Sequence, residues 1–121
     1  MTNYKNLEAW KKAMTLVKVV YLLTKQFPKE ELYALTSQTK RAAISIPSNI
    51  AEGIGRNYKK DTIQFLHISR GSLYELETLL NIAVMVDVLT EKDFEPLPTI
   101  IDECIRILNG LISYYEKSIL K

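Results

Sequence analysis

Apolar residues recur at steps of three and four along most of this chain, which is the spacing of one face of an α-helix. The first stripe consists of Leu7, Trp10, Met14, Val17 and Tyr21, widened by Leu16, Val20 and Leu23. Asn6 precedes the stripe and is of a residue type that caps helices. The helix should end before Phe27, because the residue that precedes a proline, here Pro28, is pushed out of the α region. The pattern predicts a first helix over about residues 7–26 with a broad buried face.

A proline lies in the middle of the second stripe, which continues through Lys40, Ala43, Ile44, Ile46 and Ile50. Inside a helix, Pro47 removes its own backbone hydrogen bond and presses on the carbonyl four residues earlier. Its neighbours are small or hydroxylated, which lets the helix kink and lets another backbone come close. We predict one kinked helix over residues 37–53, ended by Gly53 and Gly55. The alternative is a break at 45–47 and a new helix that starts at Pro47.

Polar connectors precede and follow this second helix. Residues 28–36 form the first, with a turn of helix at 29–32. Thr36 or Ser37 is predicted to cap the helix that follows, because either hydroxyl can accept from the free N–H groups of a first turn. Residues 56–61 form the second connector.

The third stripe is long and contains a glycine. It consists of Ile63, Leu66, Ser69, Leu73, Leu76, Leu80, Ala83 and Val84. Gly71 lies in its middle, where glycine costs roughly 1 kcal/mol relative to alanine. A helix that tolerates this cost usually needs the missing side chain for close packing, so we expect Gly71 to face a neighbouring helix. The helix should stop near Asp87.

The last segment predicts one more long helix after a short turn. Residues 90–93 resemble a capping box, but Pro96 and Pro98 interrupt the helix early, so its main run is expected from about Thr99. The apolar positions of that run are Ile100, Ile101, Cys104, Ile107 or Leu108, Leu111, Tyr115 and Ile119. No segment alternates with period two for long enough to indicate a strand. The sequence therefore predicts an all-α fold, an antiparallel up-down-up-down four-helix bundle with a proline-kinked second helix.

The composition is that of a single domain over residues 1–121. Hydrophobic residues make up 47% and charged residues 25% of the chain, which excludes disordered and fibrous classes. No apolar run approaches the roughly 18 residues of a membrane span, and the first residues lack the apolar centre of a signal peptide. The lone cysteine, Cys104, has no partner for an internal disulfide and is normal for a reducing interior. We therefore expect a cytoplasmic protein with no membrane partner.

The net charge of +2 conceals an asymmetry. Residues 1–60 carry 11 Lys and Arg against 4 Asp and Glu, whereas residues 61–121 carry 5 against 10, so the halves differ as +7 and −5. Such a split favours either a basic surface that meets polyanions or two opposed faces. The alternative is that antiparallel helices from the two halves pair their charges across shared edges.

Enzyme chemistry has little support in the sequence. His67 is the lone histidine, and a di-iron bundle needs two Glu-x-x-His pairs, whereas position 64 is Gln. A helical ribonuclease needs an Arg a turn or two before the His, and Arg56 lies eleven residues upstream. Cys104 has no second Cys for a zinc site, and residues 53–55 follow no strand, as a dinucleotide fingerprint requires. We predict no catalytic residue, metal or cofactor, and a structural or surface role for His67.

The candidate nucleic-acid-binding residues are Lys40, Arg41, Arg56, Tyr58, Lys59 and Lys60. Lysine and arginine neutralise phosphates and a tyrosine can stack on an unpaired base, so this set suits RNA or DNA. The alternative is the solvated rim of an ordinary bundle. Arg41 and Arg70 have a further structural alternative, because both lie on or beside predicted buried faces and Glu52 and Glu75 are available as ion-pair partners.

Four runs of sequence carry a resemblance to a known family: residues 7–13, 33–56, 65–77 and, most specifically, Ser-Ile-Pro-Ser-Asn-Ile-Ala-Glu-Gly at 45–53. They resemble the bacterial four helix bundle protein family, also called intervening-sequence proteins of the 23S ribosomal RNA. The resemblance implies a four-helix bundle that assembles into a homopentamer. It also implies similarity to accessory proteins of diversity-generating retroelements, basic pentamers that bind nucleic acid and a reverse transcriptase. It implies no catalytic residues.

These observations lead to one main hypothesis and two alternatives. The main one is a non-enzymatic homo-oligomer that binds structured RNA or DNA, since five copies of a +2 chain carry about +10 around one axis. The first alternative is a protein–protein scaffold for a nucleic-acid enzyme such as a reverse transcriptase, with the acidic second half as the contact. The second, a helical ribonuclease that uses His67, is disfavoured by the missing arginine spacing.

Overall fold

The computed structural model describes residues 3–120, and these residues are almost entirely helical. Two short 3₁₀ turns and five α-helices follow one another as η1 (Tyr4–Asn6), α1 (Glu8–Thr24), η2 (Lys29–Glu31), α2 (Leu35–Ile54), α3 (Lys59–Met85), α4 (Glu91–Phe94) and α5 (Leu97–Leu120). The described residues contain no β-strand. The predicted all-α class and its four long helices are confirmed.

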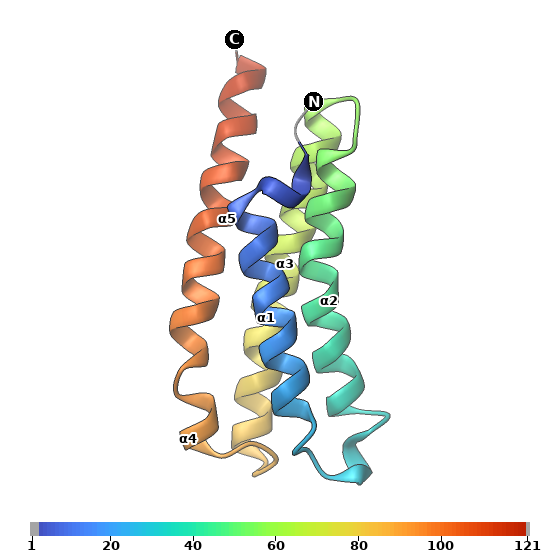
Figure 1. Cartoon of the computed structure of the whole chain (residues 1–121), viewed down its shortest axis with the longest axis vertical. Helices are drawn as coiled ribbons and strands as arrows, with labels where there is room; N and C mark the ends of the chain where they lie inside the picture. The colour runs from blue at the N-terminus through green and yellow to red at the C-terminus, as the bar shows by residue number, and fades with distance from the viewer. Residues whose placement is uncertain (1–2, 121) are drawn as a thin grey trace.

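The four long helices lie side by side along one axis (Figure 1). The colour sequence passes down α1, up α2, down α3 and up α5, and the short α4 lies at the lower end. In cyclic order α1 packs on α2, α2 on α3, α3 on α5 and α5 on α1. The loop between α2 and α3 therefore lies at the same end as η1 and the end of α5 (Figure 1).

All four long helices contribute to one hydrophobic core. Its fully buried large side chains are Leu16, Val20, Ile46, Ile50, Leu66, Leu73, Leu76, Leu80, Leu97, Ile101 and Leu108. Cys104 is buried among them, and burial raises the pKa of its thiol to about 11. The predicted core role of this cysteine is confirmed, and at neutral pH the thiol is protonated.

The predicted buried stripe of α1 is rotated relative to the observed one. The buried face runs through Ala9, Ala13, Leu16, Val20 and Thr24, whereas the predicted Met14 and Tyr21 are 44% and 39% exposed. The physical reason is that α1 packs on α2 and on α5. The face that these neighbours bury includes the alanines Ala9 and Ala13 together with Leu16 and Val20.

Two predicted N-caps are wrong. Asn6 lies inside η1, and Asn3 is the residue whose side chain accepts a backbone N–H there, from Lys5 at 3.0 Å. The helix α2 begins at Leu35, before both predicted caps, and no side chain caps it. Thr36 is instead buried in its first turn. The cap at Thr90 is confirmed, because its hydroxyl accepts the N–H of Asp93 at 3.1 Å.

The helix α2 continues through Pro47, which is buried. The alternative of a break at 45–47 is therefore wrong, and the predicted kink at Pro47 stays a prediction. Side chains next to the proline bond to the backbone of the preceding turn. The hydroxyl of Ser48 donates to the carbonyl of Ile44 at 2.8 Å, and the amide of Asn49 donates to the carbonyl of Ser45 at 2.8 Å.

The last helix begins earlier than predicted. Its first residue is Leu97, which is fully buried, rather than Thr99. Pro98 therefore lies in the first turn of α5, where the N–H that proline lacks has no helical partner to lose. The predicted stop of α3 near Asp87 is confirmed, because α3 ends at Met85 and Asp87 adopts a left-handed φ of 63°.

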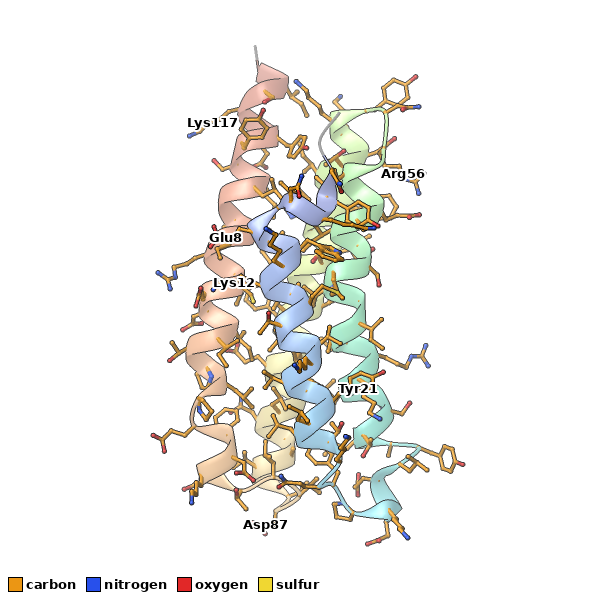
Figure 2. The ribbon with its side chains drawn as sticks, viewed as in Figure 1. Glu8, Lys12, Tyr21, Arg56, Asp87 and Lys117 are labelled. Atoms are coloured by element: carbon orange, nitrogen blue, oxygen red, sulfur yellow. The ribbon has the colours of Figure 1, made fainter. Side chains whose placement is uncertain are left out.

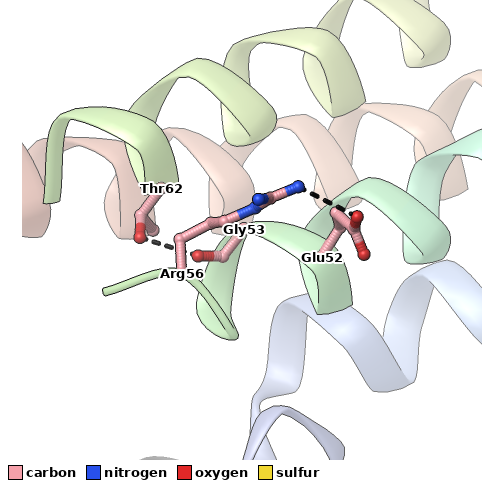
Figure 3. Close-up of polar contacts among 4 residues, drawn as sticks. All are labelled: Glu52, Gly53, Arg56 and Thr62. Atoms are coloured by element: carbon pink, nitrogen blue, oxygen red, sulfur yellow. Dashed lines mark hydrogen bonds and ion pairs between the residues drawn. The ribbon is translucent and has the colours of Figure 1, made fainter. Parts of the chain in front are cut away.

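The seam between α2 and α3 is closed by buried hydroxyl groups. Ser69 donates to the carbonyl of Ile46 at 2.8 Å, and Thr62 donates to the carbonyl of Gly53 at 2.7 Å (Figure 3). Both donors reach from α3 to the backbone of α2. Such bonds require the two helices to lie close together.

Gly53 is the glycine that this close approach requires. A Cβ at Gly53 would lie 2.8 Å from the Cβ of Phe65 and 3.1 Å from the carbonyl oxygen of Thr62. Gly71 is the opposite case, because it is exposed and a Cβ there would meet nothing within 4 Å. The prediction that Gly71 is needed for close packing is wrong.

We predict that Gly71→Ala stabilises the protein by about 0.5–1 kcal/mol. Alanine loses less backbone entropy than glycine in a helix, and the added methyl group meets open space. The check is the free energy of unfolding from urea denaturation followed by circular dichroism. A loss of stability would show that Gly71 faces a partner after all.

Candidate nucleic-acid interface

The six predicted binding residues fall into two groups that lie apart on the bundle. Lys40 and Arg41 belong to the second turn of α2, whereas Arg56 follows the end of that helix. Fifteen residues separate the two arginines, which is roughly 20 Å of helix. Figure 2 shows Arg56 at the end of the bundle that holds the α2–α3 loop. The structure therefore does not bring all six residues into one site.

The loop group is built by a tight connection between α2 and α3. At the end of α2, the N–H of Gly55 donates to the carbonyl of Ala51 at 3.2 Å, and the N–H of Arg56 donates to the carbonyl of Gly53 at 3.2 Å. Tyr58 is extended and α3 begins at the next residue. The predicted connector over 56–61 is thus shorter, and Lys59 and Lys60 lie in the first turn of α3.

Arg56 is already engaged within the protein. Its Nη2 lies 3.1 Å from Oε1 of Glu52, one helical turn earlier, as Figure 3 shows. The same guanidinium lies over the ring of Phe65, 4.6 Å from the centroid. These contacts tie the loop to both helices, so the first role that the structure supports for Arg56 is to hold the loop in place.

Tyr58, Lys59 and Lys60 are the free members of the loop group. All three are exposed, Tyr58 by 72%. Neither lysine forms an ion pair among the described residues. Two positive charges in the first turn of a helix oppose the helix dipole, and only Asp61 offsets them in that turn. An anion bound at this end would relieve that repulsion.

In the other group, Lys40 contacts an aromatic ring, whereas Arg41 forms no ion pair among the described residues. The Nζ of Lys40 lies over the ring of Tyr21, 4.7 Å from the centroid, so part of its charge is used in a cation–π contact. Arg41 is exposed and borders a hollow between α2 and α3. The predicted ion-pair partners are wrong, because among the described residues neither Arg41 nor Arg70 forms an ion pair, and Glu52 pairs with Arg56 instead.

Arg70 takes part in a contact that the sequence did not reveal. Its guanidinium donates to Oδ1 of Asn109 at 2.9 Å, which links α3 to α5, and lies 2.8 Å from Nδ1 of His67. Because arginine only donates, Nδ1 of His67 accepts in this contact. His67 is exposed. Among the described residues, no group of His, Cys, Asp and Glu side chains is arranged to hold a metal ion.

One ion pair joins the two oppositely charged halves of the chain. Nζ of Lys12 on α1 lies 2.7 Å from Oε1 of Glu103 on α5. The hydrogen bond and the charge of Lys12 hold the pKa of Glu103 below its ordinary value of 4.5. The carboxylate in turn raises the pKa of Lys12. Of the ion pairs among the described residues, only this one crosses between the halves.

We predict a small, pH-dependent cost for Glu103→Gln. A carboxyl whose pKa falls on folding stabilises the protein above its unfolded pKa, and this contribution disappears as the pH falls through the lowered folded value. The variant should therefore be less stable than the wild type at about pH 7, and this difference should be smaller at about pH 3, below the ordinary pKa of the carboxyl. Urea denaturation at both values, with Glu116→Gln as a control, measures this. If the stability difference between the two proteins is as large in acid as at pH 7, the ion pair with Lys12 is not its cause.

Two features near the candidate residues were missed in the sequence. The pairing of Glu52 with Arg56 has a readable signal, because residues four apart share a helix face. The hollow beside Arg41 has no such signal, because it depends on how α2 and α3 pack.

Within the described part of the chain, no helix combines the length and apolar composition that crossing a bilayer requires.

Comparison with known proteins assigns the sequence to a family. A family model described as 23S rRNA-intervening sequence protein matches residues 5–110, which include all of α1, α2, α3 and α4 and the first part of α5. Among curated proteins, no match to the sequence was found. Since the family match spans most of the chain, the chain belongs to the 23S rRNA-intervening sequence protein family.

Proposed function

We propose that this chain is a non-enzymatic, cytoplasmic homo-oligomer, an up-down-up-down bundle with α2 kinked at Pro47, that binds structured RNA or DNA through its basic surface. The observation that carries the proposal is the free group at the α2–α3 loop, Tyr58, Lys59 and Lys60. Because the family description refers to 23S rRNA, we take RNA as the first nucleic acid to test.

The chemistry of this group suits a nucleic acid. Lys59 and Lys60 are exposed and without ion pairs, so binding phosphates requires no internal contact to be broken. The ring of Tyr58 is open to solvent and offers a stacking surface for an unpaired base. Arg56 holds the loop against the two helices through its contacts with Glu52 and Phe65.

Assembly would multiply this surface. Each chain carries +2, so five copies carry about +10, and a ring would repeat the loop group around one axis. Large apolar side chains are exposed on each of the four long helices, most of them on α1 and α3, and this supports a subunit interface. On α1 they are Met14, Tyr21 and Leu22, and on α3 and its end they are Ile68, Tyr74, Ile82, Met85 and Val86.

The test is a titration of a labelled, structured fragment of 23S rRNA with the purified protein at about 50 mM and about 200 mM salt. Phosphate contacts release counterions, so the dissociation constant should rise roughly tenfold between the two conditions. Binding that does not depend on salt, or no binding at low salt, contradicts the proposal.

The alternative is a scaffold that holds a nucleic-acid enzyme, such as a reverse transcriptase, without binding the nucleic acid itself. The exposed apolar side chains of α3 favour it, because such side chains mark protein contacts as well as subunit contacts. A pull-down from nuclease-treated lysate separates the two functions. A scaffold keeps its protein partner after the nucleic acid is digested, whereas an RNA-binding protein loses whatever it held through RNA.

A further inference from the structure

A polar groove lies beside the first turns of α2, away from the α2–α3 loop. Its volume is about 580 Å³, and it is lined by Tyr33, Ser37, Gln38, Arg41, Ser45 and Glu75. Tyr33 precedes α2, the next four residues belong to α2, and Glu75 comes from α3. This volume falls in the range of small-molecule sites. The groove is therefore large enough for a single base or nucleoside.

Opposite charges border this groove without neutralising each other. Arg41 and Glu75 lie on neighbouring helices, yet they form no ion pair with each other or with any other described residue. No hydrogen bond within the described residues engages either side chain. A ligand that presents an acceptor edge next to a donor edge can satisfy both at once.

An aromatic ring and small polar groups complete the groove. Tyr33 is 93% exposed, so one face of its ring is free to stack on a planar ligand. Ser45 accepts hydrogen bonds from Ser72 at 2.8 Å and from Asn49 at 2.9 Å, and these bonds fix the wall of the groove between α2 and α3. The surroundings of Arg41 are therefore ordered by contacts independent of any ligand.

We propose that this groove binds an unpaired guanine of the RNA, which rests on the RNA-binding function proposed above. The O6 and N7 atoms of guanine accept from the guanidinium of Arg41, and the adjacent N1–H and N2–H groups donate to the carboxylate of Glu75. Tyr33 stacks on the base. Adenine fits worse, because its N6 amine faces the guanidinium and its N1 carries no proton for Glu75.

The carboxylate is what distinguishes this site from a phosphate site. A phosphate bound to Arg41 would lie in the same groove as Glu75, and two like charges in one site repel each other. A base carries no such charge. Arg41 is thus assigned to recognition of a base, and Lys59 and Lys60 to phosphates.

The experiment compares two short fluorescent oligouridylates that differ in one central base, guanine or adenine. Wild-type protein should bind the guanine oligonucleotide about tenfold more tightly, which is the range of one well-placed base contact. Glu75→Gln should reduce the preference to less than twofold, because the amide has one acceptor oxygen for N1–H and N2–H where the carboxylate has two. Glu77→Gln, on the same helix outside the groove, is the matched control and should keep it.

Tyr33→Ala supplies a second test that does not depend on the folding of α3, since Tyr33 is almost fully exposed. It should weaken the guanine oligonucleotide several-fold through lost stacking. Equal binding of the two oligonucleotides by the wild type, or a guanine preference that survives Glu75→Gln, overturns the proposal. If structured 23S rRNA still binds in a salt-dependent way in that case, the groove assignment fails and the RNA-binding function stands. If no RNA binds, both fail.

Discussion

Gly53→Val is expected to destabilise the protein by about 2–3 kcal/mol, as overpacked side chains do. The new side chain would begin 2.8 Å from the Cβ of Phe65, where two carbon atoms do not fit, and 3.1 Å from a backbone oxygen of α3. The helices must separate to accept it. Separation also weakens the buried hydrogen bond from Thr62 to the carbonyl of Gly53. Urea denaturation followed by circular dichroism measures the loss.

The matched control is the same substitution at the other helical glycine, Gly71→Val. Both glycines lie inside long helices, but a side chain at Gly71 meets open space. This variant should change the free energy of unfolding by less than about 0.5 kcal/mol. At an exposed helical position with no neighbour, valine and glycine differ only in helix propensity, and that difference is small. Equal losses at the two positions would mean that the close approach of α2 to α3 is not what requires Gly53.

The double substitution Lys59→Glu and Lys60→Glu is expected to weaken binding of structured RNA by ten- to a hundredfold at about 50 mM salt. The two lysines are the exposed, unpaired cations at the α2–α3 loop, and the change turns two attractive phosphate contacts into repulsive ones. The fold should be unaffected, because both side chains point to solvent and an acidic first turn complements the helix dipole.

Lys18→Glu with Lys25→Glu is the matched control for this pair. These lysines are also exposed and without ion pairs, and the change in net charge is identical, but they lie on and just after α1. The control should lose affinity several-fold less than the loop variant. If both variants lose the same affinity, RNA responds to net charge and not to the loop.

The helical pattern predicted α3 and α5 well and α1 less well, for a physical reason. In α3 the large residues Leu66, Leu73 and Leu80 mark the centre of the buried face, so periodicity finds it directly. In α1 the centre of the buried face includes Ala9 and Ala13, which contribute little to a hydrophobic pattern. The large flanking side chains dominate the pattern there and rotate the predicted face.

The roles of the glycines were not predictable from the sequence. The sequence predicted that Gly53 ends the second helix and that Gly71 packs against a neighbour, but α2 runs past Gly53 to Ile54 and Gly71 is exposed. What distinguishes them is the neighbour that each one meets, Phe65 in one case and solvent in the other. That neighbour is set by the register between α2 and α3, which no single segment specifies.

The candidate site shows the same division between local and tertiary information. The sequence identified the basic residues by type, and the order of the chain already placed Tyr58, Lys59 and Lys60 together. It did not show that Arg56 is held by Glu52 and Phe65. Nor did it show the groove at Arg41, because Glu75 reaches that groove from a different helix.

The most direct measurement of the central claim is the position at which bound RNA touches the protein. Ultraviolet cross-linking of the wild-type protein to a 23S rRNA fragment, followed by digestion and mass spectrometry, gives this position. Trypsin cleaves after Arg56 and after Lys59 and isolates residues 57–59, which contain the exposed ring of Tyr58. We predict a nucleotide adduct in that short peptide. Adducts confined to α1 or α5, with none in residues 57–59, would contradict the account.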